Sequence, residues 1–451
     1  MRMISLKIKK SNSILAAFAL LSIGLSANAQ EATTPAQPDP VVEQSEADLT
    51  ILKKIKISGL VQMDYQSADT AGISSVAGGS FGSGIDNRFQ LRRGRIKATY
   101  DNENTQGVLQ IDMTEKGVGL KDAYLKFTEP WIQTVAVQGG VFDRPFGNEI
   151  EYSSSALETP ERSRIIQTLF PGEKDLGAKL ILQAPKTSPW NFIKLDAGFF
   201  NGNGQTSTSS YVETDKYKDF IGHLFLGKAT KSEAIKWGIG ASYYKGGFAE
   251  FYNTTTASTN EYTMTKDANG NPAYVKNTVG KGDQAKREYF GFDGQLSFDW
   301  WLGITQLRGE YLWGTQPATS SSSNSLTIAA SADTYVRKFN GYYGYFIQNI
   351  FQTPVQLVVK YDVYDPNTDV DGDNIGKAAS KGFVTTGAGD VKYTTWGFGI
   401  NYRWSSNVTL MAHYDLVKNE TTSNIKTSST LTDLSSDRKD NVFTLRLQYA
   451  F

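Results

Sequence analysis

The most constraining feature of this sequence is an alternation of large apolar and polar residues that continues to its last residue. In the final segment, NVFTLRLQYAF, every second residue counted back from Phe451 is large and apolar, and most residues between are polar. A period of two residues is typical of a β-strand with two different faces. The alternation recurs from residue 55 onward, which predicts an all-β chain.

The number of strands and the lengths of their connections define the expected architecture. Short turns such as DNENT and WSSN follow the even-numbered strands, and long loops follow the odd-numbered ones, except at 116–118. This layout predicts a transmembrane antiparallel β-barrel with short periplasmic turns and long external loops. We expect sixteen strands, at 55–66, 88–101, 106–115, 119–129, 133–142, 176–184, 191–200, 219–229, 234–246, 287–299, 303–316, 339–350, 353–364, 391–404, 407–418 and 440–451.

Aromatic residues support a membrane barrel over a soluble β protein. The short turns carry or adjoin Trp131, Trp190, Trp300, Trp301 and Trp404. Indole rings at one height are typical of an aromatic girdle at a membrane interface. A closed barrel also explains why no tail follows the last strand, because that strand pairs with the first. We expect Phe451 and Tyr449 to form the C-terminal signal that barrel-assembly machinery reads.

The N-terminus carries a targeting segment. Four basic residues precede an apolar run at 14–25, and Ala27-Asn28-Ala29 forms a cleavage site. The run is too short to span a membrane, which favours a signal peptide at 1–29. We expect a flexible arm at 30–52, rich in Pro, Ala, Glu and Gln, and the barrel at 53–451. The expected location is the outer membrane of a Gram-negative bacterium.

Composition and motifs argue against several other functions. The 46 basic and 46 acidic residues balance, and removing the signal leaves a net charge of −4, so nucleic acid is not an expected partner. With no cysteine and only His223 and His413, we expect no catalytic residues, cofactor or metal site. The segment DPNTDVDGDNIG (365–376) alternates like a calcium loop but lacks its Gly and its final Glu, so we interpret it as a polar external loop.

Strand parity predicts which basic side chains line the channel. In RRGRIKATY, Ile96 and Tyr100 share the lipid face, so Arg93, Arg95 and Lys97 point inward as a ladder. The apolar face switches near Arg92, which predicts a β-bulge there. Parity also places four further basic side chains in the lumen, and acidic residues such as Asp64 and Asp112 oppose them. The four are Arg308, Lys360, Arg403 and Arg446.

The connection 143–175 is the candidate for a loop that folds into the barrel and narrows it. It carries Arg144, Arg162 and Arg164, and it also contains several acidic residues. We expect Glu161 to pair with Arg162 or Arg164 and hold these cations in place.

Several stretches, in order, resemble the phosphate-selective porin O and P family. They are NRFQLRRGRIKATY, GGVFDRPFGNE, LETPERSRIIQTLFPGEKDLGAKL, FFNGNG, LRGEYLWG, LVVKYDVYDPNTD and NVFTLRLQYAF. The resemblance implies a sixteen-stranded homotrimeric porin whose inward-folded loops carry basic side chains that guide anions. Two positions depart from the family pattern, where His223 and Glu173-Lys174 stand in place of arginine.

The expected function is passive diffusion of inorganic phosphate or other small anions through a water-filled channel in outer-membrane lipid. One alternative is a general or carboxylate-preferring porin. Another is a closed barrel that acts as a structural element or receptor.

Overall fold

The computed structural model describes most of the expected barrel. The N-terminal signal peptide expected at 1–29, and the arm up to residue 51, lie outside the described residues. Among the residues that are described, no helix is both long and apolar enough to cross a membrane. The described residues are 52–205, 211, 213, 215–249, 260–277, 284–325 and 333–451.

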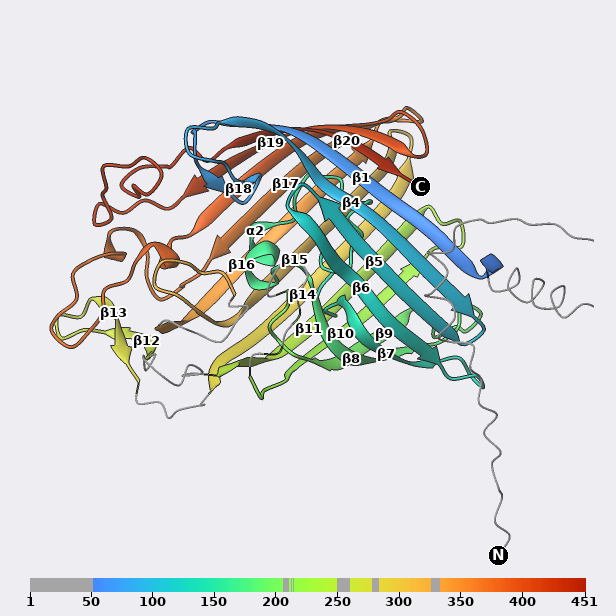
Figure 1. Cartoon of the computed structure of the whole chain (residues 1–451), viewed down its shortest axis with the longest axis horizontal. Helices are drawn as coiled ribbons and strands as arrows, with labels where there is room; N and C mark the ends of the chain where they lie inside the picture. The colour runs from blue at the N-terminus through green and yellow to red at the C-terminus, as the bar shows by residue number, and fades with distance from the viewer. Residues whose placement is uncertain are drawn as a thin grey trace, which may run out of the picture. The chain divides into compact units, whose positions relative to one another are not determined.

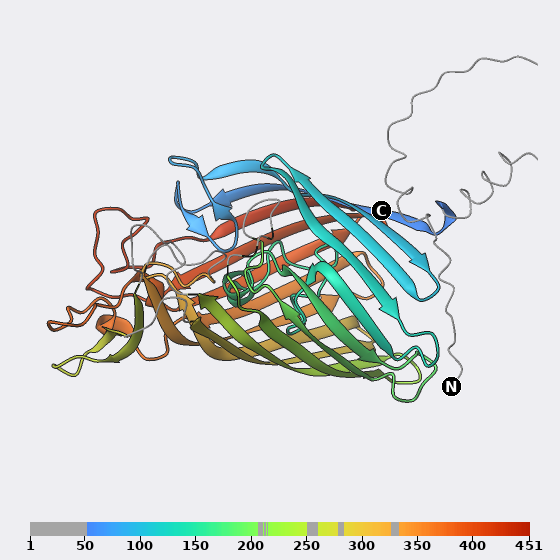
Figure 2. The same cartoon turned by 60° about the horizontal axis from the view of Figure 1, so that its bottom comes forward.

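Sixteen antiparallel strands close into a barrel, which confirms the predicted fold (Figures 1 and 2). Strand β1 pairs with both β4 and β20, so the first and last strands meet and the wall has no free edge. The wall strands are β1 (Ile55–Ala68), β4 (Asn87–Asn102), β5 (Thr105–Thr114), β6 (Gly117–Thr128), β7 (Val135–Asp143), β8 (Lys174–Gln183), β9 (Ile193–Phe200), β10 (Asp219–Ala229), β11 (Ile235–Ala249), β14 (Gln284–Trp300), β15 (Gly303–Ala318), β16 (Thr334–Asn349), β17 (Val355–Asp365), β18 (Tyr393–Arg403), β19 (Val408–Asn419) and β20 (Val442–Ala450).

The long connections contain short elements that the alternation did not predict. A hairpin of two two-residue strands packs against buried side chains of β19 and β20, a longer hairpin lies at the long-loop end, and a short helix lies within the connection from β7 to β8. Elements of two to six residues are too short to produce a detectable period in the sequence. They are β2 (Ser74–Ser75), β3 (Gly79–Ser80), β12 (Glu261–Lys266), β13 (Pro272–Lys276), α2 (Arg164–Leu169), η2 (Gly372–Asn374) and η3 (Ala388–Asp390).

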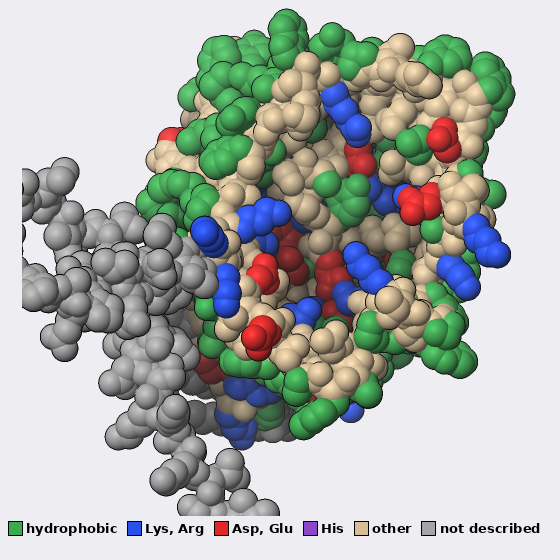
Figure 3. Space-filling view, turned by 90° about the vertical axis from the view of Figure 1, so that its right-hand side faces the viewer, with side chains coloured by type: hydrophobic (Ala, Val, Ile, Leu, Met, Phe, Trp, Pro, Cys, Tyr) green, Lys and Arg blue, Asp and Glu red, His purple; other side chains and the backbone are tan. Residues whose placement is uncertain are grey.

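The two faces of the wall differ as the alternation requires. On β20, Leu445 and Tyr449 are 44% and 46% exposed, whereas Thr444 and Arg446 are buried. Figure 3 looks at the short-turn end, where hydrophobic side chains surround the outside and charged ones lie in the hollow. The outer face therefore suits hydrocarbon and the inner face suits water.

Exposed tryptophans mark the short-turn end, in agreement with the expected girdle. The indoles at the turns are 64% to 87% exposed: Trp131, Trp190, Trp301 and Trp404. Trp300 is 42% exposed and donates a hydrogen bond to Thr305.

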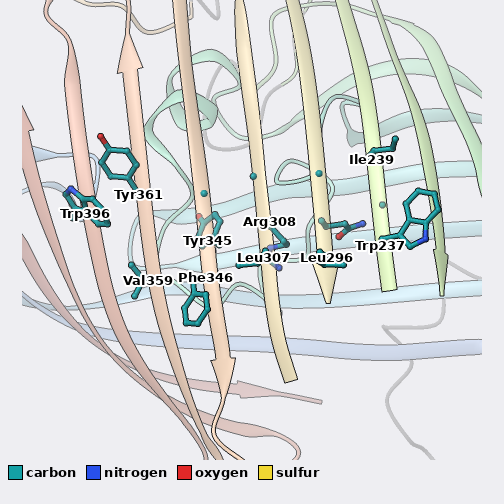
Figure 4. Close-up of a pocket in the computed structure, with 15 residues that line it drawn as sticks. Trp237, Ile239, Leu296, Leu307, Arg308, Tyr345, Phe346, Val359, Tyr361 and Trp396 are labelled. Carbon is teal, nitrogen blue, oxygen red and sulfur yellow. The ribbon is translucent and has the colours of Figure 1, made fainter. Parts of the chain in front are cut away.

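The outer face of β14, β15 and β16 carries a shallow depression of about 760 Å³ (Figure 4). Three outward glycines meet across these strands, because Gly294 pairs with Gly309 and Gly309 pairs with Gly344. Apolar side chains border it, among them Trp237, Ile239, Leu296, Leu307, Phe346, Val359, Tyr361 and Trp396. Its outward position separates it from the water-filled interior.

The seam between the first and last strands has a specific side-chain contact. Gly59 and Phe451 exchange two backbone hydrogen bonds of 2.8 and 3.1 Å. The Phe451 ring lies over Gly59, since a Cβ built at residue 59 would stand 2.3 Å from the ring. The glycine therefore provides the space into which the C-terminal aromatic ring packs.

We expect Gly59→Ala to weaken closure of the barrel, because the new methyl group displaces the Phe451 ring. Because the Phe451 ring is 53% exposed and can turn aside, we expect a loss at the lower end of overpacking costs, about 1 kcal/mol of unfolding free energy. Urea unfolding in lipid vesicles, followed by tryptophan fluorescence, measures the change. The matched control is Gly139→Ala, where a Cβ meets nothing within 4 Å. Equal stability of the two variants would contradict the proposed role of the Gly59 contact.

Candidate functional site

The connection between β7 and β8 lies inside the barrel and contacts the wall on several sides. The side chain of Gln62 on β1 donates to the Ser154 carbonyl at 3.2 Å, and Asn401 on β18 donates to the Glu158 carbonyl at 2.9 Å. Figures 1 and 2 show helix α2 of this segment among the strands. We call residues 144–173 the inner loop.

One side of the inner loop packs on apolar lumen-facing side chains. Phe146, Ile165 and Phe170 of the loop join a buried cluster with Tyr289 and Phe339 of the wall. Full burial of such side chains stabilises by about 1.5–3 kcal/mol each. The cluster holds the inner loop against the wall formed by β9–β17.

Two polar hollows lie along the opposite part of the wall. The outer vestibule, of about 460 Å³, opens toward the long-loop end and is lined by residues that include Gln90, Arg92, Glu115, Lys121 and Glu161. The inner vestibule, of about 360 Å³, lies toward the short-turn end.

Residues that line the inner vestibule include Lys97, Gln110, Arg162 and Glu173. The two hollows therefore follow the same strands and the same loop from opposite ends.

A cluster of charged residues lies where the two vestibules approach each other, and we call it the neck. Arg95 pairs with Asp112 at 2.9 Å, and Arg162 pairs with Glu173 at 3.0 Å. The neck consists of Arg92, Arg93 and Arg95 of β4, Asp112 of β5, Lys121 of β6, and Glu161, Arg162 and Glu173 of the inner loop.

Two β-bulges produce the dense charge at the neck. In the pairing of β1 with β4, Gln62 faces Arg93 and Met63 faces Leu91, so Arg92 is the extra residue. The bulge predicted near Arg92 is therefore confirmed. A bulge re-aims side chains, and here the guanidinium groups of Arg92 and Arg93 both reach Glu161 inside the barrel.

The second bulge was not predicted. In the pairing of β5 with β6, Gln110 faces Asp122 and Ile111 faces Leu120, which leaves Lys121 unpaired in the ladder. A sequence signal existed, because the apolar parity of GVGLKDAYLKF shifts between Leu120 and Ala123. Lys121 lines the outer vestibule and contacts Gln205 at 3.3 Å.

Three of the residues expected from the sequence meet at or beside the neck on the wall. Arg93 is buried and donates to Gln62 at 2.6 Å, and Arg95 also donates to the Ser154 hydroxyl at 3.0 Å. Lys97 is half-buried and lines the inner vestibule. The ladder expected on β4 thus faces the polar path.

Arg446 lies in the same region, but its guanidinium group already interacts with two carboxylates. Its guanidinium group forms two hydrogen bonds to Asp64, of 2.7 and 2.8 Å, and lies 3.7 Å from Glu161. It also donates to the Pro160 carbonyl at 2.8 Å.

The other expected arginines hold the inner loop. Arg308 on β15 forms an ion pair with Glu158, and Arg144 donates to the carbonyls of Glu173 and Pro171. Arg164 begins α2, lies 3.8 Å from the centre of the Tyr393 ring and 3.9 Å from Asp440. None of these three arginines has its guanidinium group at the neck.

The expected pairing of Glu161 with Arg162 or Arg164 is wrong. Glu161 binds Arg92 instead, with an Nη2–Oε2 distance of 2.8 Å, and Arg162 takes Glu173 as its partner. The expectation failed because it considered only neighbours in sequence, whereas Arg92 reaches the loop from the wall.

The electrostatic setting keeps the loop acids ionised. Burial alone would raise the pKa of Glu161, but Arg92 and Arg93 outweigh burial and lower this pKa to about 2. Burial likewise opposes ionisation of Glu173, and Arg162 and Lys121 nevertheless hold its pKa well below the usual range. His223 lies elsewhere, on β10, where its Nε2 is 2.9 Å from Asp293.

The closed wall, the lumen-spanning loop and the charged neck together define an outer-membrane porin. A family model described as phosphate-selective porin O and P matches residues 56–451. The chain belongs to this family, which places it in the outer membrane of a Gram-negative bacterium. No curated protein matches the sequence.

Solved porin structures are similar over most of the chain at low sequence identity. The anion-selective porin from Comamonas acidovorans is 11% identical, with a TM-score of 0.47, covering 88% of this chain and 99% of its own. The outer membrane channel DcaP of Acinetobacter baumannii is 12% identical, with a TM-score of 0.47 and coverages of 88% and 97%. OmpT of Vibrio cholerae is 10% identical, with a TM-score of 0.46 and the same coverages.

We expect the stabilising effect of the Glu161 carboxylate to depend on pH. Because its folded-state pKa is depressed from 4.5 to about 2, its contribution is complete above about pH 5 and is lost as the pH falls toward 2. The shift corresponds to a contribution on the order of 3 kcal/mol.

Urea unfolding of wild type and Glu161→Gln in vesicles, from pH 7 to pH 2, measures this contribution. The free-energy difference between the two proteins should shrink across the acid range. A difference that stays constant down to pH 2 would show that the carboxylate charge is not what stabilises the wild type.

Proposed function

We propose that this porin admits small anions, inorganic phosphate among them, by passive diffusion past the neck. The observation that carries the proposal is the charge of the neck, where five cations face three carboxylates. Charge at a constriction decides which ions enter a water-filled pore. Low-dielectric protein walls strengthen that field compared with bulk water.

Phosphate as a permeating anion is supported by the kind of cation at the neck. Four of its five cations are arginines: Arg92, Arg93, Arg95 and Arg162. A guanidinium group offers a planar fork of donors that matches two oxygens of an oxyanion. In this proposal residues 143–175 act as the constriction loop.

A general porin without anion preference is the second candidate. It is favoured by the ion pairs, because Arg95 and Arg162 each already hold a carboxylate within 3.0 Å. Under this candidate the neck cations serve mainly to position the loop.

The assembly that we propose is a homotrimer inserted in outer-membrane lipid, after removal of residues 1–29. Outward side chains such as Phe398, which is 45% exposed, would contact the lipid. Phe451 and Tyr449 would serve as the assembly signal in the unfolded chain before they pack at the seam.

Reversal potentials across planar bilayers in a potassium chloride gradient test the proposal. A sign that indicates chloride as the more permeant ion supports it, and a sign that indicates potassium rejects it. Zero selectivity favours the general porin, and absence of single-channel conductance favours a closed scaffold or receptor.

We expect Lys121→Gln to lower the chloride-to-potassium permeability ratio by about threefold. This is the size expected when one unit charge a few ångströms from the permeating ion is removed in a water-rich setting. The control is Lys338→Gln, which makes the same charge change on a side chain that is 70% exposed at the long-loop end of β16. Equal effects of the two substitutions would contradict a specific role for Lys121.

A further inference from the structure

The carboxylate of Glu161 lies among three guanidinium groups. Its oxygens are 2.8 Å from Arg92 Nη2, 3.5 Å from Arg93 Nη2 and 3.7 Å from Arg446 Nη2. The Glu161 side chain is only 8% exposed, and those of Arg93 and Arg446 are 3% and 0% exposed. The three guanidinium groups therefore form a largely buried anion-binding site, and the Glu161 carboxylate occupies it.

The site contains a guanidinium donor that Glu161 leaves unused. The Nε of Arg93 is buried and finds no hydrogen-bond partner among the described residues. A carboxylate has two oxygens in one plane, whereas a tetrahedral oxyanion has up to four that point in different directions. The unused donor therefore points to a ligand with more oxygens than Glu161 supplies.

The charge balance favours the same class of ligand. Asp64 neutralises one of the three arginines through its two bonds to Arg446. If the Glu161 side chain leaves, two positive charges remain, those of Arg92 and Arg93. A doubly charged anion matches them, and a chloride ion does not.

The site is accessible, and Glu161 can leave it by rotation of its side chain alone. Arg92 and Glu161 both line the outer vestibule, so they form the side of the neck that an anion from outside meets first. The main chain beside Glu161 is held by other bonds, from Arg446 to the Pro160 carbonyl and from Thr159 Oγ1 to the Glu161 carbonyl. Movement of the carboxylate therefore does not require the inner loop to unfold.

We propose that Glu161 is a tethered competitor for permeating oxyanions: a tetrahedral oxyanion of the phosphate class displaces its carboxylate from Arg92 and Arg93. This inference rests on the proposed function of the neck as an anion path. Conduction requires a site that binds strongly enough to admit an ion and weakly enough to release it. The Glu161 carboxylate returns as the anion departs, which speeds release, whereas chloride passes without displacing it.

The test is blockade of single-channel chloride current by added inorganic phosphate in planar bilayers. In Glu161→Gln the competitor has no charge, so the phosphate concentration that halves the current should fall at least tenfold. The matched control is Glu115→Gln, because Glu115 is an exposed acid that lines the same vestibule outside the three-arginine site. Its effect should stay below twofold.

Two results would overturn the inference: a half-blocking concentration that is unchanged in Glu161→Gln, or one that falls equally in both variants. If Glu161→Gln yields no channels, Glu161→Asp takes its place, since it keeps the charge but shortens the reach to Arg92. We then expect a fall of about threefold, and no fall would equally reject the inference. Failure of the proposed function can be told apart from failure of this inference, because a wild-type reversal potential that indicates potassium as the more permeant ion rejects the function without any variant.

Discussion

Every other feature of this protein depends on one constraint, that backbone hydrogen bonds inside hydrocarbon must be made within the protein. An open sheet would leave a row of unpaired N–H and C=O groups at each edge, and each costs several kcal/mol in lipid. Pairing of β1 with β20 removes both edges, and Gly59 gives Phe451 the room to pack there. Closure also creates the enclosed interior in which polar chemistry can be arranged.

The inner loop divides that interior unequally because it binds the wall in two ways. On one side it packs through apolar residues such as Phe146 and Phe170, and water is excluded. On the other side its acids meet cations of the wall, and the polar vestibules lie there. Arg308 and Arg446 help to attach the loop and are already paired with the carboxylates of Glu158 and Asp64. A basic side chain that faces the lumen therefore does not necessarily bind a permeating ion.

The bulges show how membrane energetics and function act on the same residues. In a regular strand, consecutive side chains point to opposite faces, and Arg92 or Arg93 would face lipid at a cost of about 2–4 kcal/mol near the bilayer midplane. The bulge on β4 avoids this cost and brings both guanidinium groups to one carboxylate. The bulge on β6 turns Lys121 into the lumen, two strands away from β4. Asp112 on β5 therefore lies between the arginines of β4 and this lysine.

The sequence by itself determined the sixteen wall strands, their inward and outward faces, the two rims and the bulge at Arg92. These features follow from local periodicity, because a strand in a membrane wall has one face in lipid and the other in water along its whole length. Only the tertiary structure decided the partners of the charged residues, such as Glu161 with Arg92, and the division of arginines between the neck and the loop attachments. The pairs Arg92–Glu161 and Arg308–Glu158 join residues 69 and 150 positions apart, and a long side chain can reach any of several partners that the barrel brings within its range.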